Sequence, residues 1–187
     1  IGALYMRRGV DLPSFIVGGK QEDGRRAGTS AVPGIVGLGA ASRLARLEDD
    51  HDTVLDLRNL LEDSILNKIP NARLNGPADR SKRLPNTSNI SFEYVEGQNI
   101  LTHLDEAGIY VSTGSACHSS SHESSPTLRA MNVPYTAAQG SVRFSVGRYN
   151  TEAEIRETLT VLPGIMKKLV DMSPYENELK ALYAKRG

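Results

Sequence analysis

The chain has 187 residues, of which 39% are hydrophobic and 24% are charged. This composition is typical of a folded globular protein, and the length allows one domain, or one domain with part of another. Lysine and arginine total 22, as do aspartate and glutamate, so the formal net charge is zero. Because neither sign of charge dominates, we expect no nucleic acid partner and no binding to an anionic membrane surface.

The sequence contains no segment that predicts a membrane span or export. No run approaches the roughly 18 consecutive apolar residues of a membrane helix, and residues 1–10 lack the ordered regions of a secretory signal. The single cysteine, Cys117, cannot form an internal disulfide, which fits a reducing compartment. We therefore expect a cytoplasmic protein.

The first third of the chain predicts a strand, a loop and a long helix. Residues 1–7 form an apolar strand pattern with no turn or cap before it, so we expect the chain to be part of a longer protein. Residues 18–30 are glycine-rich and polar and predict a loop. Ser30 is a candidate N-cap for a helix over residues 33–70, in which the acidic residues 48–52 indicate a solvated or kinked section. Apolar residues follow at helical spacing: Leu57, Leu61, Ile65 and Ile69.

Shorter elements follow after Asn71. We predict strands over 72–77, 86–94, 109–112 and 141–146, and helices over 98–107, from 151 onward and over 174–185. Thr151 and Glu154 form a capping box, and Pro163 with Gly164 predicts a kink in the helix that follows. The interleaved helices and strands favour an α/β fold with a sheet of mixed strand directions.

Cys117 is the sharpest chemical feature of the sequence. A lone cysteine usually behaves as a small buried hydrophobe. However, residues 113–127 are rich in serine and almost free of large apolar groups, so we expect an exposed, mobile loop and a nucleophilic or sulfur-carrying thiol. His118 and His122 lie close in sequence, but this spacing lacks the paired ligands of zinc sites, and a metal site built by this chain alone is not favoured.

Two further residues are candidates for binding anions. Arg143 shares the polar face of the strand 141–146 and can hold the carboxylate of an amino acid through its planar fork, with a solvated surface arginine as the alternative. Thr29 follows Gly28 in a loop that leads into a helix, where a hydroxyl and backbone N–H groups suit a phosphate. Simple capping of the helix explains this loop equally well. We expect His51 and His103 to be surface residues.

Several runs of the sequence resemble the C-terminal half of the cysteine desulfurases, most closely their nitrogen-fixation (NifS-type) branch. These runs are IGALYMRRG, GRRAGTSAVPGIVGLGAA, NTSNISF and the segment from STGSACHSSS through MNVPYTAAQGSVRFSVGRYNTEAEI. The resemblance covers essentially the whole chain in order, and the Ser-Ala-Cys loop followed by VRFSVGR is its most specific part.

The resemblance implies a homodimeric fold-type I enzyme that uses pyridoxal 5'-phosphate, takes sulfur from L-cysteine and releases alanine. Cys117 matches the loop cysteine that carries the persulfide, and Arg143 matches the arginine that binds the substrate carboxylate. Thr29 matches the threonine that reaches the cofactor phosphate of the other subunit. The sulfur is expected to pass to an iron-sulfur scaffold protein, with Cys117 as a candidate metal ligand in a cluster shared transiently during transfer.

The resemblance also implies a domain organisation. Residues 1–32 match the end of the large cofactor domain, 33–70 a connecting helix, and 71–187 a small mixed α/β domain. The Schiff-base lysine of the family lies upstream of the segment matching IGALY, so we expect this chain alone to be inactive. Two alternatives remain: a stand-alone sulfur-relay module that docks a scaffold without pyridoxal chemistry, and a thiol hydrolase in which His118 or His122 activates Cys117.

Overall fold

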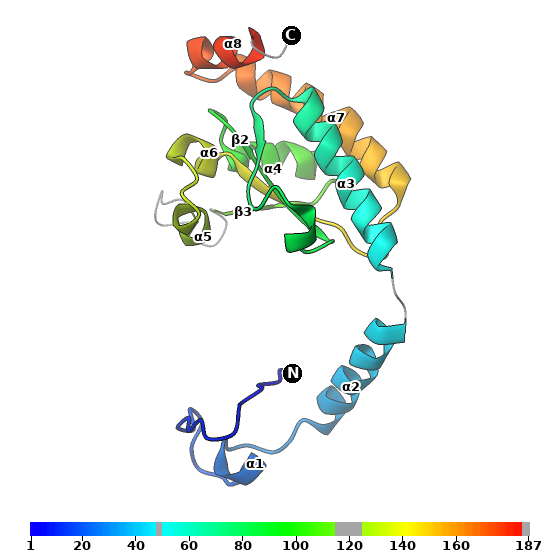
Figure 1. The fold of residues 1–187 in the computed structure, drawn as a ribbon, viewed down its shortest axis with the longest axis vertical. Coiled ribbons are helices and arrows are strands. Elements are labelled where there is room, and N and C mark those ends of the chain that lie inside the picture. Colours follow the sequence, from blue (N-terminus) through cyan, green and yellow to red (C-terminus); the bar gives the residue numbers. More distant parts are fainter. Residues whose placement is uncertain (48–49, 115–124, 185–187) are drawn as a thin grey trace. The chain divides into compact units, whose positions relative to one another are not determined.

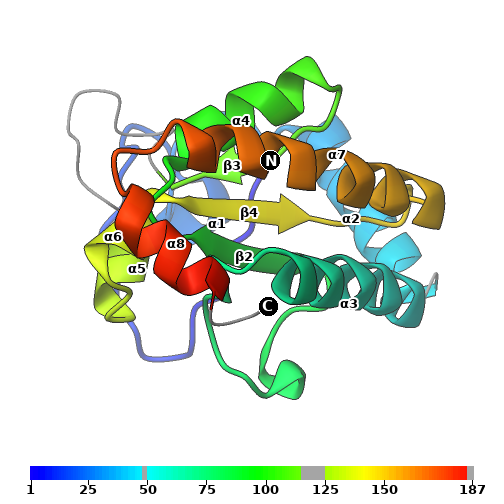
Figure 2. The ribbon, with the colours of Figure 1, turned by 90° about the horizontal axis from the view of Figure 1, so that it is seen from above.

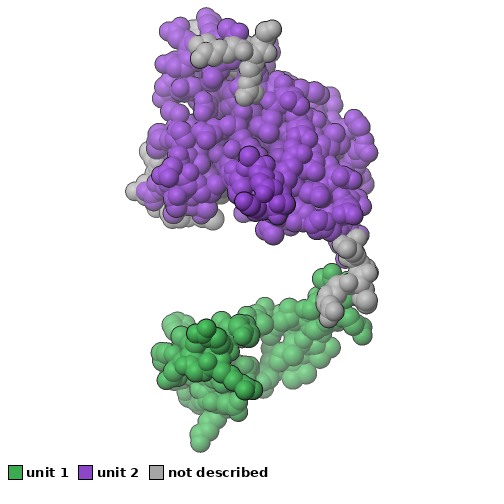
Figure 3. All heavy atoms as spheres, in the orientation of Figure 1, with its two compact units in different colours: residues 1–49 green, residues 50–187 purple. Residues whose placement is uncertain are grey.

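The computed structural model describes residues 1–47, 50–114 and 125–184. The chain divides into two compact units, Ile1–Asp49 and Asp50–Gly187, which Figure 3 distinguishes by colour. Among the helices of the described ranges, none is both long enough and apolar enough to cross a membrane.

The first unit contains the short helix α1 (Gln21–Gly24) and the helix α2 (Val32–Leu47), shown in blue in Figure 1. The predicted strand over residues 1–7 is wrong, because these residues have no regular secondary structure. A strand needs a neighbour to satisfy its backbone groups. The described part of this unit contains only an isolated bridge between Gln21 and Arg26, so residues 1–7 have no ladder to join.

The predicted single helix over residues 33–70 is two helices. α2 ends at Leu47 and α3 (His51–Lys68) begins at His51, with the boundary between the two units at Asp49 and Asp50. Asp50, the residue before α3, is not helical, and aspartate is a weak helix former. The assignment of residues 1–32, 33–70 and 71–187 to family domains stays a prediction.

The second unit is built on a four-stranded sheet. Its strands are β1 (Ala72–Leu74), β2 (Thr87–Phe92), β3 (Ser112–Thr113) and β4 (Ser141–Ser145), in the order β1-β2-β4-β3. All three neighbouring pairs are antiparallel, so the expected mixture of strand directions is wrong for the described strands. The connection from β1 to β2 carries only a 3₁₀ turn, Arg80–Lys82, and antiparallel neighbours need no crossover helix between them.

Three helices cover one face of this sheet and form the core with it. α3, α4 (Gly97–Glu106) and α7 (Glu152–Asp171) lie along the strands in Figures 1 and 2. The helices α5 (Pro126–Ala130), α6 (Tyr135–Gln139) and α8 (Glu176–Ala184) complete the unit. The most deeply buried core side chains come from both layers: Leu61, Ile65, Ile90, Phe92, Ile100, Leu104, Val142, Leu162 and Met166. Because side chains alternate along a strand, the remaining residues of β2 and β4 face away from these helices.

The start of α7 forms as predicted. The Thr151 hydroxyl accepts a hydrogen bond from the Glu154 backbone N–H at 3.3 Å, and the Glu154 carboxylate accepts one from the Thr151 N–H at 2.7 Å. This confirms the capping box, and α7 continues from it through Pro163 as one helix.

A close backbone approach fixes the entry into β4. Gly140 precedes the strand, and its carbonyl accepts a hydrogen bond from the Phe92 N–H at 3.0 Å. A Cβ atom at this position would overlap the carbonyl oxygens of Phe92 and Val95. Any side chain at position 140 would therefore push β4 away from the end of β2.

A buried ion pair ties α3 to the sheet. Glu62, 1% exposed, accepts two hydrogen bonds from the Arg83 guanidinium at 2.7 and 2.8 Å and a third from the Ser88 hydroxyl at 2.7 Å. Burial alone would raise the pKa of Glu62, but these hydrogen bonds and the positive charge of Arg83 outweigh it and hold the pKa below its usual value. Arg58 is fully buried one turn away, and its three guanidinium nitrogens have no hydrogen-bond partner among the described residues.

Candidate functional site

Arg143 lies on β4, a central strand of the sheet, between two polar partners. In the strand register it is opposite Asn89 of β2 on one side and Ser112 of β3 on the other. The residues before and after it, Val142 and Phe144, are buried in the core, whereas Arg143 is exposed. This confirms the prediction that Arg143 belongs to the polar face of its strand.

The guanidinium of Arg143 is available for a ligand. Within the described part of the chain it has no ion pair and no hydrogen bond, although other arginines of the second unit pair with carboxylates. A planar group with several unused donors on an open sheet face suits a carboxylate, which can accept two parallel hydrogen bonds from it.

A network of amides and hydroxyls includes Asn89, the cross-strand partner of this arginine. The side-chain oxygen of Asn89 accepts hydrogen bonds from Asn75 Nδ2 at 2.7 Å and from the Ser141 hydroxyl at 3.0 Å. Asn75 Nδ2 also donates to the Ser91 hydroxyl at 2.7 Å. Sequence reasoning missed these residues as part of the site. The available signal was the alternation in NTSNISF, which puts Asn89 on the strand face opposite Ile90 and Phe92.

Thr29 lies in the first unit, in the loop before α2. Its side chain is exposed, and the preceding Gly28 has a φ of +95°, a conformation that favours glycine. The Arg26 guanidinium holds this loop by donating to the Gly28 carbonyl at 2.8 Å and to the Ser30 hydroxyl at 3.1 Å. The loop therefore presents the Thr29 hydroxyl next to a fixed backbone turn, which suits an anion such as phosphate.

Cys117, His118 and His122 lie outside the described residues, so their proposed roles stay predictions. The described chain ends on this side with β3 and Gly114, and Ser112 of β3 is the register partner of Arg143. In the sequence, Cys117 is four residues beyond Thr113.

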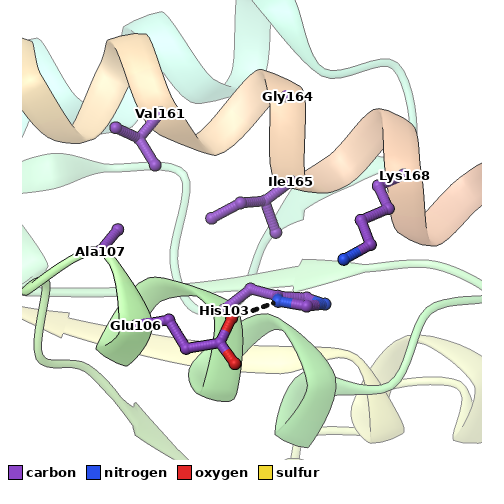
Figure 4. A pocket seen from close by; sticks show the side chains of 7 residues that line it. All are labelled: His103, Glu106, Ala107, Val161, Gly164, Ile165 and Lys168. Atoms are coloured by element: carbon purple, nitrogen blue, oxygen red, sulfur yellow. Dashed lines mark hydrogen bonds and ion pairs between the residues drawn. The ribbon is translucent and has the colours of Figure 1, made fainter.

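A shallow depression of about 320 Å³ lies between α4 and α7 (Figure 4). His103 and Glu106 line it from α4, with 2.9 Å between Nδ1 and the carboxylate oxygen, and Lys168 lines it from α7. The His103 side chain is 24% exposed, so it is partly buried where we expected a surface residue. In the described ranges, no three His, Cys, Asp or Glu side chains gather in a way that could hold a metal ion.

The family model of the class-V aminotransferases matches residues 1–157. The chain belongs to this family. A cysteine desulfurase of Gluconacetobacter diazotrophicus is 54% identical over 177 residues, which cover 94% of this chain and 44% of that protein. The cysteine desulfurase NifS of Azotobacter vinelandii is 48% identical, again over 94% of this chain and 44% of the relative. The resemblance to the cysteine desulfurases is therefore confirmed, and the chain spans a little under half the length of these curated relatives.

Solved structures confirm the fold class. A NifS-like protein superimposes with a TM-score of 0.74 at 36% identity, covering 88% of this chain and 42% of that one. A NifS-like protein from Rickettsia africae gives a TM-score of 0.70 at 31% identity, covering 84% and 41% of the two chains. The chain thus shares the α/β architecture of the corresponding part of this enzyme class.

Proposed function

We propose that this chain is the C-terminal portion of a cysteine desulfurase, an enzyme that converts L-cysteine to L-alanine and keeps the sulfur as a persulfide on Cys117. The observation that carries the proposal is the identity of about half of all residues to cysteine desulfurases over 94% of the chain. The exposed guanidinium of Arg143, which has no ion pair or hydrogen bond with any described residue, supports it independently, because the substrate is an amino acid with a carboxylate to be held.

Arg143 is the proposed carboxylate anchor. Its strand is central in the sheet, and buried neighbours hold its backbone, so the guanidinium is a donor fork on a rigid support. A carboxylate bound there fixes one end of L-cysteine and leaves the thiol of the substrate free to meet a nucleophile. Rigid placement of one reactant removes much of the entropy cost of the reaction.

Thr29 is the proposed contact to the phosphate of pyridoxal 5'-phosphate, across a homodimer interface. The exposed hydroxyl beside the glycine turn fits a phosphate group, and this fit is the ground on which we assign it. When bound, the cofactor supplies the electron sink that makes the substrate sulfur electrophilic. Of this chain, Thr29 binds the phosphate and Arg143 orients the substrate.

Cys117 is the proposed sulfur acceptor. Its thiolate attacks the sulfur of L-cysteine, an S–S bond forms, and the C–S bond of the substrate breaks. The electron pair of that bond remains with the substrate carbon, which takes up a proton to give alanine. A nucleophile in a serine-rich segment that begins next to the strand partner of Arg143 can collect sulfur at the site and then deliver it elsewhere.

The proposed partners follow from the assignment as a cysteine desulfurase. The enzyme acts as a homodimer in the cytoplasm and passes sulfur to an iron-sulfur scaffold protein, in the service of nitrogen fixation. The nitrogen-fixation part of this proposal rests on the resemblance to the NifS-type branch, and one of the similar relatives is the NifS of Azotobacter vinelandii. During delivery, Cys117 and the scaffold share the transferred sulfur, and a transient shared cluster is part of this proposal.

The test uses the full product of the gene, loaded with pyridoxal 5'-phosphate. We expect alanine formation from L-cysteine, and mass spectrometry of peptides is expected to find one extra sulfur atom on Cys117. Cys117→Ala should abolish the persulfide. Arg143→Lys should raise the KM for L-cysteine about ten- to a hundredfold, because lysine cannot form the two parallel hydrogen bonds of a guanidinium.

Full persulfide and alanine formation by the Cys117→Ala variant would contradict the proposal. A gene product that binds scaffold and accepts sulfur, but forms no alanine from L-cysteine, would favour the sulfur-relay module instead.

A further inference from the structure

The strand register puts a second polar group directly beside the proposed carboxylate anchor. Asn89 of β2 and Arg143 of β4 are cross-strand partners, so their side chains project from the same face of the sheet. Directly opposed residues have Cβ atoms about 4.5–5.5 Å apart, which allows both side chains to contact one small ligand.

The orientation of the Asn89 side chain is fixed by its neighbours. Its oxygen accepts two hydrogen bonds, from Asn75 Nδ2 and from the Ser141 hydroxyl, which uses both of its lone pairs. Asn75 is itself buried and held by Ser91, so the network is anchored in the sheet. Exchanging its oxygen for its nitrogen would set two amide donors, Asn89 Nδ2 and Asn75 Nδ2, against each other, so the amide keeps this orientation.

The nitrogen of the Asn89 amide, Nδ2, has no hydrogen-bond partner among the described residues. It is also not among the buried atoms that lack one. Two N–H donors thus remain on the open polar face next to the Arg143 guanidinium. Arg143 has no acceptor of its own among the described residues, so the two side chains offer hydrogen-bond donors from neighbouring positions on the same face of the sheet.

We propose that Asn89 is a second donor to the substrate carboxylate and works together with Arg143. The guanidinium binds one carboxylate edge, while Nδ2 of Asn89 donates to one oxygen from the side of β2. The neutral amide adds a directional hydrogen bond without a second positive charge, so it sets the angle of the substrate about the arginine. The inference rests on the proposed function, because it assumes that Arg143 binds the carboxylate of L-cysteine.

The test measures steady-state kinetics with L-cysteine on the full, cofactor-loaded enzyme carrying Asn89→Ala or Asn89→Asp. Loss of a hydrogen bond to a charged group predicts a rise in KM of about ten- to a hundredfold for Asn89→Ala, with kcat much less affected. Asn89→Asp keeps the shape but points an anion at the carboxylate, so its KM should rise further. Thr87→Ala is the matched control, since Thr87 lies two residues away on the same face of β2 and pairs with Ser145.

A double-mutant cycle separates this role from a structural one. If Asn89 and Arg143 hold the same carboxylate, Asn89→Ala should raise KM much less in the Arg143→Ala background than in the wild type. Equal KM values for Asn89→Ala and Thr87→Ala, fully additive effects with Arg143→Ala, or a lower melting temperature with unchanged KM would each overturn the inference. Failure of the proposed function is a separate result: Arg143→Ala itself would then leave KM unchanged.

Discussion

The buried carboxylate of Glu62 allows a sharp test of how the second unit is held together. Glu62→Gln keeps the size of the side chain but removes the charge that faces Arg83, whose side chain is only 8% exposed. It also removes the negative charge of Glu62 from the surroundings of the fully buried Arg58 one turn away. Breaking a buried ion pair by removing one partner costs about 3–5 kcal/mol, because the remaining charge is desolvated and unpaired.

The measurement is urea unfolding of the full chain followed by circular dichroism. The free energy of unfolding falls by about 2 kcal/mol per M of urea, so this loss lowers the urea concentration at the unfolding midpoint by about 1.5–2.5 M. The matched control is Glu152→Gln, which removes an exposed pair with Arg156 on α7. Exposed pairs contribute about 0.2–1 kcal/mol, so the control should lose less than about 1 kcal/mol. If both variants lose the same stability, the network around Glu62 does not hold α3 to the sheet as argued.

Three further outcomes are expected from the same unfolding assay. Because the pKa of Glu62 is depressed in the folded chain, its stabilisation is complete above the unfolded value of about 4.3 and is lost as the pH falls through the lower folded value. The acid limb of the stability curve should therefore be shallower for Glu62→Gln, and parallel curves would argue against this linkage. Gly140→Ala should lower the free energy of unfolding by about 3 kcal/mol or more, because the new Cβ would overlap backbone atoms. Gly164→Ala is the control: its Cβ meets nothing within 4 Å, so the free energy of unfolding should rise by up to about 1 kcal/mol. Equal effects of the two substitutions would refute the close backbone approach at Gly140. Thr151→Ala should lower the free energy of unfolding by about 1 kcal/mol, because α7 loses its N-cap. Thr160→Ala, in the interior of α7, is the control, and an equal loss of stability in both variants would count against the cap.

Local patterns were sufficient wherever the physical cause lies within a few residues. The capping box of Thr151 and Glu154 was predicted correctly because donor and acceptor are three residues apart. The alternation in SVRFSV predicted that Arg143 would be exposed between buried neighbours, since successive side chains of a strand point to opposite faces. The family was also available from the sequence, because its motifs are short and contiguous.

Patterns failed where an element depends on a distant partner. Residues 1–7 have the composition of a strand but no neighbouring strand in the described part of their unit. The long helix expected over 33–70 is interrupted at Asp50, the first residue of the second compact unit. Helical periodicity does not reveal such a boundary, because it shows only which face of a helix is apolar.

The sequence by itself determined the family, the positions of most elements and the three candidate residues Thr29, Cys117 and Arg143. Only the tertiary structure decided which residues meet. Asn89 and Arg143 become neighbours through strand pairing, and Glu62 meets Arg83 and Ser88 only when α3 packs on the sheet. The physical reason is that hydrogen bonds and ion pairs act over a few ångströms, whereas these partners are separated by 21 to 54 residues of chain, so no local pattern can encode their contact.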